Sequence, residues 1–137
     1  MGVMEMFSKE TKFLIVDDML TARKFITKNL RELGYTEFIE ARNGEVAWQI
    51  LSKEDTEIDF IISDYDMPVM SGFELLKKVR ASEKLKETIF LMITAVGQEN
   101  KMMEVLDAGV NNYLIKPFDK EVLAEKLEST WESINNR

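Results

Sequence analysis

The sequence contains no cysteine and no histidine among its 137 residues. Without cysteine the chain can form neither a disulfide bond nor a thiolate metal site. Without histidine it has no imidazole base, cannot carry a phosphohistidine and cannot build a usual zinc site. Any chemistry of this chain must therefore rest on carboxylates, hydroxyls, amines and the backbone.

An excess of basic residues and a long apolar run are also absent. The 25 acidic residues outnumber the 18 basic ones, which gives a formal net charge of −7. Nucleic acids and anionic membrane surfaces attract basic patches, so this balance argues against both as partners. No apolar run approaches the ~20 residues of a membrane span, and the first residues lack a signal-peptide pattern. We therefore expect a cytoplasmic protein.

Length and composition indicate one globular domain. With 137 residues, 45% of them hydrophobic, the chain is long enough to bury a core. We expect residues 1–10 to form a short, loosely held lead-in. Residues 11–137 are expected to form a single domain without an output domain, because no linker or composition break divides them. A monomer is expected, since no long apolar stripe is left over beyond what the fold must cover.

The most informative stretch is Phe60-Ile61-Ile62-Ser63-Asp64-Tyr65-Asp66-Met67-Pro68. A run of branched apolar residues is typical of a strand buried on both faces. Pro68 cannot continue this strand, so Asp64 is predicted to lie at its carboxyl end. Open parallel sheets bind their ligands at that edge, and an unpaired buried carboxylate there would be unfavourable. Asp64 therefore needs a cation, a chemical role, or both.

Apolar runs separated by helical patterns divide the rest of the chain. Besides the central strand, strands are predicted at residues 12–16, 36–41, 89–93 and 113–115. Helices are predicted at 21–33, after the N-cap Asn43, after the capping-box pair Ser71 and Glu74, at 98–107, and after the N-cap Asp119. Strands that alternate with helices form right-handed βαβ units. The pattern therefore predicts an α/β fold, with a five-stranded parallel sheet covered by helices on both faces.

Polar side chains follow four of the five predicted strands. They are Asp17-Asp18, Asp64, Thr94 and Lys116. If the strands are parallel, these side chains meet at one edge of the sheet. Packed carboxylates repel one another, and Mg²⁺ relieves the repulsion because it prefers oxygen ligands. Lys116 adds a positive charge, and Thr94 adds a hydroxyl donor.

This set of groups suits phosphoryl transfer to a carboxylate. Asp64 would attack a phosphorus atom and become an acyl phosphate. Mg²⁺, Lys116, Thr94 and loop N–H groups would hold the equatorial oxygens of the transferred group. Taken singly, each residue has an ordinary interpretation: Asp17-Asp18 as a helix cap, Lys116 as a solvated lysine, Thr94 as a strand-end hydroxyl. Their coincidence at the strand ends favours the functional interpretation.

The same residues resemble the response-regulator receiver domain, and most closely its stand-alone chemotaxis members, from about Lys12 to the C-terminus. The resemblance is carried by Asp17-Asp18, by Asp64 within Ser63–Pro68, by Thr94-Ala95 and by Lys116-Pro117-Phe118. It implies a flavodoxin-like fold with strand order 2-1-3-4-5. It also implies a single-domain response regulator of a two-component phosphorelay, phosphorylated by a histidine kinase. Such a protein signals by binding a partner and catalyses only its own phosphorylation and dephosphorylation.

The resemblance implies a role for each acidic position. Asp64 is the phosphoacceptor. Asp18 and Asp64 are direct Mg²⁺ ligands, together with the backbone carbonyl of Asp66. Asp17 contributes to the metal site through water.

Three further positions receive roles from the resemblance. Lys116 contacts the phosphoryl group, across a cis Lys116–Pro117 bond. Thr94 moves toward the phosphate and Tyr113 turns inward with it. This shift biases the face formed by the fourth helix, fifth strand and fifth helix, which would bind a flagellar motor switch protein. For Tyr113, ordinary packing stays an equal alternative.

Four residues depart from the pattern of the chemotaxis members. Asp66 replaces an amide two residues past the phosphoacceptor, and Val96 replaces a glutamate two residues past the threonine. Tyr65 stands where tryptophan is common, and Ser71 stands where Asp or Asn usually opens the third helix. The first two replacements flank the acyl phosphate. They bear on its hydrolysis rate and on the use of a chemotaxis phosphatase.

Other functions match parts of the pattern. A relay intermediate would pass its phosphoryl group onward instead of binding an output protein. Asp64-Tyr65-Asp66 also matches the D-x-D opening of haloacid-dehalogenase-type phosphatases, although those place it on the first strand of a longer chain. A degenerate receiver would serve only as a docking module, but here all five key residues are present. A flavodoxin relative that binds flavin would need a hydroxyl-rich phosphate loop in place of Asp17-Asp18.

Overall fold

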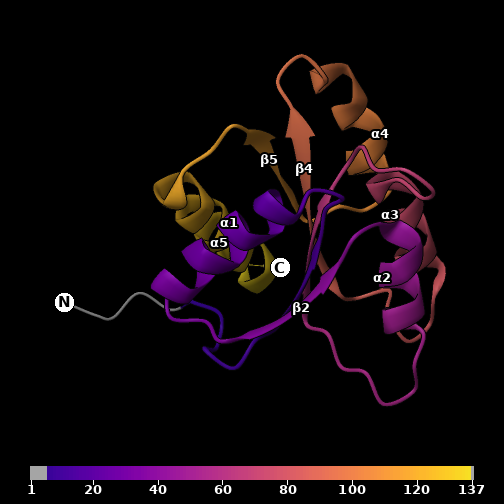
Figure 1. Ribbon diagram of the computed structural model, residues 1–137, viewed down its shortest axis with the longest axis horizontal. Helices are drawn as coiled ribbons and strands as arrows, with labels where there is room; N and C mark the ends of the chain where they lie inside the picture. The colour runs from indigo at the N-terminus through magenta and orange to yellow at the C-terminus, as the bar shows by residue number, and fades with distance from the viewer. Residues whose placement is uncertain (1–5, 137) are drawn as a thin grey trace.

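The computed structural model describes residues 6–136. Its five strands form one parallel sheet in the order β2-β1-β3-β4-β5 (Figure 1). The strands are β1 (Lys12–Val16), β2 (Glu37–Ala41), β3 (Phe60–Asp64), β4 (Ile89–Ala95) and β5 (Asn112–Lys116). The α/β fold predicted from the alternating pattern is confirmed, and so is the strand order that the resemblance implied.

Five α-helices connect and follow the strands. They are α1 (Leu20–Glu32), α2 (Gly44–Leu51), α3 (Gly72–Ala81), α4 (Met102–Asp107) and α5 (Lys120–Asn135), and a 3₁₀ turn, η1 (Glu99–Lys101), precedes α4. The predicted caps are confirmed, because the side chains of Asn43 and Asp119 each accept a backbone N–H of the first helical turn. Ser71 and Glu74 form the predicted capping box. None of these helices is both long and apolar enough to cross a membrane.

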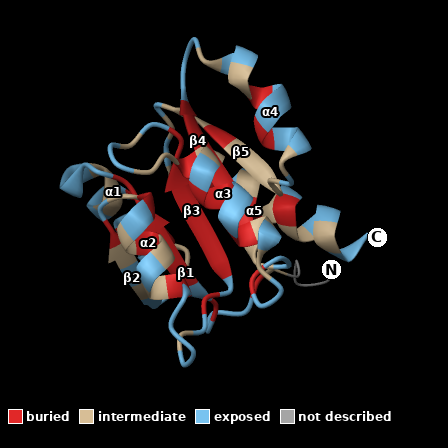
Figure 2. Cartoon of the chain, turned by 90° about the vertical axis from the view of Figure 1, so that its right-hand side faces the viewer, coloured by how far each residue is buried: buried red, intermediate tan, exposed pale blue. Residues whose placement is uncertain are grey.

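The helices cover the sheet on both faces. In Figure 1, α1 and α5 lie on one side and α2, α3 and α4 on the other. Because side chains alternate along a strand, β1 contributes Phe13 and Ile15 to the first layer and Leu14 and Val16 to the second. The central strand β3 is buried along its whole length (Figure 2). Its last residue, Asp64, therefore lies at the end of a fully buried strand.

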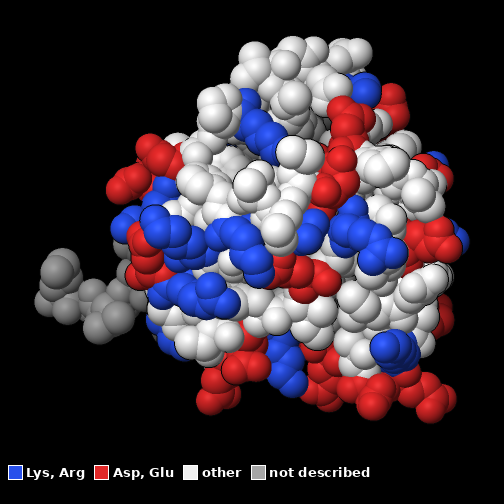
Figure 3. Space-filling view, in the orientation of Figure 1, with Lys and Arg blue, Asp and Glu red and all other residues white. Residues whose placement is uncertain are grey.

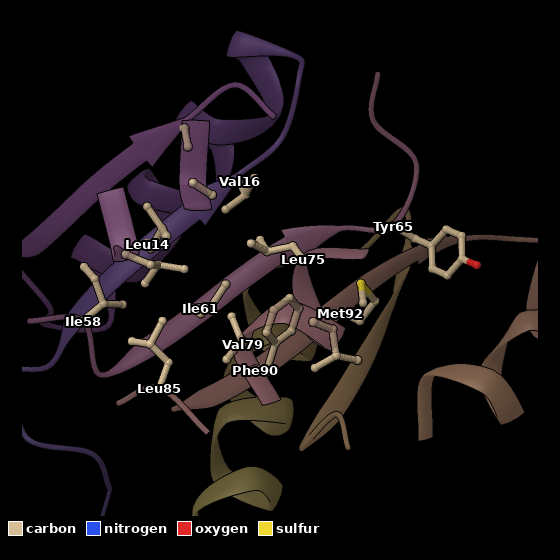
Figure 4. Close-up of a cluster of buried hydrophobic side chains, with 14 of the residues drawn as sticks. Leu14, Val16, Ile58, Ile61, Tyr65, Leu75, Val79, Leu85, Phe90 and Met92 are labelled. Carbon is tan, nitrogen blue, oxygen red and sulfur yellow. The ribbon is translucent and has the colours of Figure 1, made fainter. Parts of the chain in front are cut away.

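The apolar layer between the sheet and α2 and α3 reaches to the residue after Asp64. Figure 4 shows Leu75 and Val79 of α3 beside Ile61 of β3. Tyr65 lies at the rim of this cluster, and its hydroxyl points away from the other labelled side chains. The Tyr65 ring stacks on Phe73, with 6.1 Å between the ring centroids. Packing on both sides of Asp64 thus holds its backbone in place.

The prediction of an α-helix over residues 98–107 is wrong for its first turn. Residues Glu99–Lys101 form the 3₁₀ turn, and only Met102–Asp107 are α-helical. In this turn, the side chains of Gln98 and Lys101 reach back to Asp66 across the top of the sheet. Tertiary contacts therefore decide the backbone geometry there, and helical periodicity does not.

The expectation of a loosely held lead-in is wrong for the part of it that the structure describes; residues 1–5 lie outside the described range. Phe7 is buried and packs edge-on against Phe60 and Trp131, with 5.2 Å and 5.1 Å between ring centroids. Lys9 Nζ donates a hydrogen bond of 2.8 Å to the carbonyl of Leu33, at the end of α1. Burial of the Phe7 ring removes a large apolar area from water, and this contributes to holding the segment against the domain.

Candidate functional site at the carboxyl edge of the sheet

Three carboxylates gather at the carboxyl edge of the sheet. Asp64 ends β3, and Asp17-Asp18 directly follow β1, which is the neighbour of β3. One carboxylate oxygen from each of Asp17, Asp18 and Asp64 lies within 4.8 Å of the others. Asp17 and Asp64 are buried, whereas Asp18 is exposed. The structure thus brings together the acidic residues that the strand-end pattern predicted.

Lys116 bridges the two buried carboxylates. Its Nζ lies 3.4 Å from Asp17 Oδ2 and 3.4 Å from Asp64 Oδ2. Burial lowers the pKa of Lys116, but the charges of Asp64 and Asp17 outweigh it, so the pKa is raised and the ammonium stays charged. One positive charge facing three carboxylates leaves a net negative site. An all-oxygen site with this charge matches the ligand preference of Mg²⁺.

Burial raises the pKa of Asp64 from 3.8 to about 6. Lys116 opposes this effect by attracting the ionised form, and the neighbouring charge of Asp17 adds to it. A carboxylate that resists ionisation is one that a bound cation would stabilise strongly. The raised pKa therefore indicates that this group of residues, without a cation, is electrostatically unfavourable near neutral pH.

The raised pKa gives a testable pH dependence of stability. Between about pH 4 and pH 6 the folded chain keeps a proton on Asp64 that the unfolded chain has released, so the unfolding free energy contributed by this group falls as the pH rises. Without divalent cations at about pH 7.5, we expect the free energy of unfolding of Asp64→Asn to exceed that of the wild type by roughly 2 kcal/mol. This difference should disappear at about pH 4, where Asp64 of the folded wild type is protonated. Urea unfolding of both proteins across this range measures it. A gap that is independent of pH would contradict it.

Thr94 lies at the same edge, and its hydroxyl has no hydrogen-bond partner in the part of the chain that the structure describes. Its side chain is only 1% exposed, and among the described residues no donor or acceptor reaches Oγ1. A buried hydroxyl without a partner is unfavourable, and it is free to bind a group that arrives at Asp64. Tyr113 on β5 shares the sheet face of Thr94, since it is in register with Met92, two residues before Thr94. It is half-buried beneath Lys126, whose Nζ lies 4.4 Å from the ring centroid; its switching role stays a prediction.

The carboxylate of Asp66 is turned away from the other three. Its Oδ2 accepts a 2.8 Å hydrogen bond from Gln98 Nε2, and its Oδ1 lies 3.8 Å from Lys101 Nζ. This geometry is unlike that of a general acid/base beside the nucleophile, which the D-x-D interpretation required. The role expected of its backbone carbonyl in metal binding stays a prediction.

Two contacts at the site were not predicted from the sequence. Gly72, the first residue of α3, has its Cα against the backbone carbonyl of Asp64, so that no side chain would fit there. Arg23 of α1 donates a hydrogen bond from Nη1 to the carbonyl of Asp17. A glycine in a first helical turn, eight residues after Asp64, is a feature that the sequence does contain. The contact of the arginine has no such feature, because its partner is a backbone atom.

An apolar groove of about 480 Å³ borders the site on the α1 side. Its lining residues are Met19, Thr21, Ala22, Phe25, Ile26, Lys116, Pro117 and Phe118. Phe25 is 43% exposed and lies 5.6 Å from the ring of Phe118. The groove therefore presents an apolar surface next to the ammonium that contacts Asp64.

Comparison with known proteins identifies the family to which this chain belongs. Residues 13–128 match the family described as response regulator receiver domain. A chemotaxis protein CheY homolog of Campylobacter jejuni is 44% identical over 117 residues, which cover 85% of this chain and 89% of that protein. Chemotaxis protein CheY of Pseudomonas aeruginosa is 44% identical over 124 residues, covering 90% and 98%. The matched region contains all the residues gathered at the carboxyl edge.

A solved structure gives the same result for the fold. The chemotaxis response regulator CheY4 of Vibrio cholerae superposes with a TM-score of 0.79 at 36% identity. The superposition covers 88% of this chain and 98% of that one. The similarity therefore extends over nearly the whole sheet and its helices.

Proposed function

Because the chain belongs to the response regulator receiver domain family, we propose that it is a phosphorylation switch in which Asp64 accepts the phosphoryl group. The observation that carries the proposal is the carboxyl edge, where two buried carboxylates share one ammonium and a third carboxylate completes an oxygen-lined site. The similar curated proteins are chemotaxis proteins. Chemotaxis is therefore the process in which we place this response regulator.

Phosphorylation proceeds by attack of a carboxylate oxygen of Asp64 on the phosphorus of a phosphohistidine. An O–P bond forms as the N–P bond breaks, and the leaving imidazole nitrogen takes up a proton. The donor must be another protein, a histidine kinase, because this chain has no histidine. Lys116, held at 3.4 Å from Asp64 Oδ2, stabilises the charge that develops on the equatorial oxygens.

Mg²⁺ matches the oxygen ligands of this site. The side chains of Asp18 and Asp64 and the backbone carbonyl of Asp66 would hold the ion, with Asp17 acting through water. When bound, the ion neutralises charge on the transferred phosphoryl oxygens. Asp17 stays anchored by Lys116 at 3.4 Å, so its carboxylate keeps its place as the site fills.

The signal leaves the site through Thr94. Its unpartnered hydroxyl donates to a phosphoryl oxygen on Asp64, and the movement of β4 that follows changes the face formed by α4, β5 and α5. Apolar side chains are already exposed on and before α4, namely Val96, Met103 and Leu106. We propose this face as the binding site for a flagellar motor switch protein in the cytoplasm. The protein is a signalling protein, and its catalysis is limited to its own phosphoryl group.

A relay intermediate stays the alternative within the same chemistry. In that case the phosphoryl group moves from Asp64 to a histidine of a further protein, and no output protein binds to the α4–β5–α5 face. Binding of a motor-switch peptide to the beryllofluoride-treated protein, and not to the untreated protein, supports the switch. Rapid transfer of label to a histidine-containing domain, without peptide binding, supports the relay.

The experiment that tests the proposal is intact mass spectrometry after incubation with acetyl phosphate, with and without Mg²⁺. A single phosphoryl adduct that requires Mg²⁺ is expected. If no adduct forms, tight binding of beryllofluoride separates rapid hydrolysis from a site that cannot be phosphorylated. A chain that forms neither complex would not be a phosphorylation switch.

The groove beside the site gives the kinase a docking surface. A phosphohistidine can reach Asp64 only if the protein that carries it lies against the carboxyl edge, and the exposed Phe25 and the partly buried Phe118 line that approach. Figure 3 shows basic side chains gathered over α1. The exposed bases along α1 are Lys24, Lys28 and Arg31, against the single acid Glu32. A donor helix with apolar and acidic residues would complement this surface.

We expect Phe25→Ala to slow phosphotransfer from the kinase and to leave phosphorylation by acetyl phosphate unchanged. Truncation of a central apolar anchor typically weakens an interface enough for a roughly tenfold fall in kcat/KM of phosphotransfer. Acetyl phosphate is too small to use the groove. Met103→Ala on α4 is the matched control, because Met103 is 67% exposed but lies on the other face of the sheet. Equal losses with both phosphodonors would contradict docking at the groove.

A further inference from the structure

Arg23 on α1 is tied to two different elements beside the acidic cluster. Its side chain is only 14% exposed. Nε donates a 3.0 Å hydrogen bond to Glu40 Oε1 on β2, and Nη1 donates a 2.7 Å hydrogen bond to the backbone carbonyl of Asp17. Lys24 Nζ also donates to Glu40, at 2.8 Å. Burial raises the pKa of Glu40, but its hydrogen bonds to Lys24 and Arg23 outweigh this, so the pKa is lowered and the carboxylate is charged.

Every polar group of Asp17 has a partner. One partner, the carbonyl of Ala41, belongs to β2, and another, Arg23, is itself hydrogen-bonded to Glu40 of β2. The Asp17 N–H donates to the carbonyl of Ala41 at 3.1 Å. Its Oδ1 accepts from the N–H of Met19 at 2.9 Å, and its Oδ2 lies 3.4 Å from Lys116 Nζ. Its carbonyl is the remaining group, and Arg23 is the partner. The fully buried Asp17 is therefore held from its backbone as well as from its side chain.

Asp18 is held in a different way. Its side chain is exposed, and within residues 6–136 no hydrogen bond or ion pair of that side chain occurs. The direction of the Asp18 side chain therefore depends on the backbone. The nearest part of that backbone is the peptide that joins Asp17 to Asp18. The carbonyl of this peptide is the acceptor of the Arg23 hydrogen bond. Rotation of the peptide would swing Asp18 away from Asp17 and Asp64.

We propose that Arg23 is a positioning residue for the divalent-cation site, because it fixes the Asp17–Asp18 peptide and thereby directs Asp18 toward Asp17 and Asp64. The proposal rests on the proposed function, since it takes these carboxylates as Mg²⁺ ligands. The Arg23 side chain contacts Glu40 and the backbone carbonyl of Asp17, so it would act on the site through the backbone. Residues that orient metal ligands typically change metal affinity by about 10–100-fold when they are replaced.

Replacing Arg23 removes both its hydrogen bonds and its positive charge, and these two losses change the Mg²⁺ affinity in opposite directions. The two effects can be separated. Removing a positive charge near the carboxylates would by itself strengthen cation binding. However, Glu40 at 3.0 Å, which Arg23 shares with Lys24, offsets part of the charge of Arg23, so this electrostatic gain is reduced. Arg23→Lys keeps the charge but cannot donate to Glu40 and Asp17 in the same planar geometry. A loss of affinity in Arg23→Lys is therefore due to geometry.

The test is calorimetric titration of the whole protein with Mg²⁺. We expect Arg23→Met to weaken Mg²⁺ binding by about tenfold and Arg23→Lys to lie between it and the wild type. Lys24→Met is the matched control, since Lys24 also pairs with Glu40 but is 61% exposed and has no contact with Asp17. The Mg²⁺ affinity of Lys24→Met should stay within about twofold of that of the wild type. In acetyl phosphate reactions, Arg23→Met should raise the Mg²⁺ concentration for half-maximal rate and leave the rate at saturating Mg²⁺ nearly unchanged.

The outcomes separate this inference from the proposed function. Mg²⁺ binding by the wild type, with equal affinity in Arg23→Met, would overturn the positioning role and leave the switch intact. No Mg²⁺ binding by the wild type would overturn the metal site itself, and the inference with it. If Arg23→Met does not fold, Arg23→Lys carries the test, because it keeps the charge and loses the planar pair of hydrogen bonds to Glu40 and Asp17. A several-fold loss of Mg²⁺ affinity in Arg23→Lys supports the inference, and an unchanged affinity overturns it.

Discussion

Asp64→Ala is expected to abolish Mg²⁺-dependent phosphorylation by acetyl phosphate, with a fall in adduct of at least about 100-fold. Asp64 is the last residue of β3, and its side chain supplies one of the three gathered carboxylates. Under the proposed function, its removal takes away the attacking oxygen and weakens the cation site at once. Intact mass spectrometry of the two proteins after equal incubation measures the effect.

Asp66→Asn is the matched control for this experiment. Asp66 is also an acid at the same edge, but its carboxylate is bound to Gln98 and lies near Lys101, away from the cluster. Asparagine keeps an oxygen that can accept from Gln98 Nε2, so the adduct should still form. Labelling that survives Asp64→Ala and is lost in Asp66→Asn would move the phosphoacceptor to Asp66 and reject the assignment.

Gly72→Ala is expected to lower the free energy of unfolding by about 3 kcal/mol or more. A Cβ on Gly72 would overlap the backbone carbonyl oxygen of Asp64 and would lie 2.9 Å from the sulfur of Met92. The Gly72 N–H also donates a 2.9 Å hydrogen bond to the carbonyl of Tyr65, which ties α3 to the same segment. The added methyl group must push α3 away from the end of β3. Slower phosphorylation should accompany the loss of stability, because Asp64 moves with its carbonyl.

The change in stability that we expect for Gly72→Ala has the opposite sign to the change that helix propensity alone would give. Alanine is favoured over glycine inside a helix by about 1 kcal/mol, so open space at this position would give a stabilised protein. Gly97→Ala serves as the comparison, since nothing lies within 4 Å of its added Cβ and only its positive φ of 95° is unfavourable. That change should lower stability by about 1–2 kcal/mol. Urea unfolding that finds Gly72→Ala as stable as the wild type would show that the close approach is not needed.

Local patterns were sufficient for most of the elements. Continuous apolar runs predicted the buried strands, and β1 begins and ends at the residues expected, Lys12 and Val16. Caps were predicted correctly because a single side chain, such as Asn43 or Asp119, makes the deciding hydrogen bond within its own turn. The first turn of the helix predicted at 98–107 was wrong, since Gln98 and Lys101 are held by Asp66, more than thirty residues earlier.

The candidate site was predicted from one geometric rule. In a parallel sheet the carboxyl ends of all strands lie at one edge, so polar residues that follow strands must meet there. Asp17, Asp64 and Lys116 therefore could be grouped without knowledge of any distance, and the structure places Lys116 at 3.4 Å from both carboxylates. The rule says nothing of the direction in which a side chain turns, and so it did not predict that the carboxylate of Asp66 contacts Gln98 and Lys101.

The sequence by itself determined the strands, the caps, the buried centre of the sheet and the edge at which the chemistry lies. These features depend on side-chain periods of two and 3.6 residues and on hydrogen bonds within a few residues. Only the tertiary structure decided that Arg23 binds the carbonyl of Asp17, that Gly72 lies against the carbonyl of Asp64, and that Phe7 is buried. Those contacts join backbone atoms or flexible side chains of distant segments. No local pattern records them, because they exist only once the helices and strands are packed together.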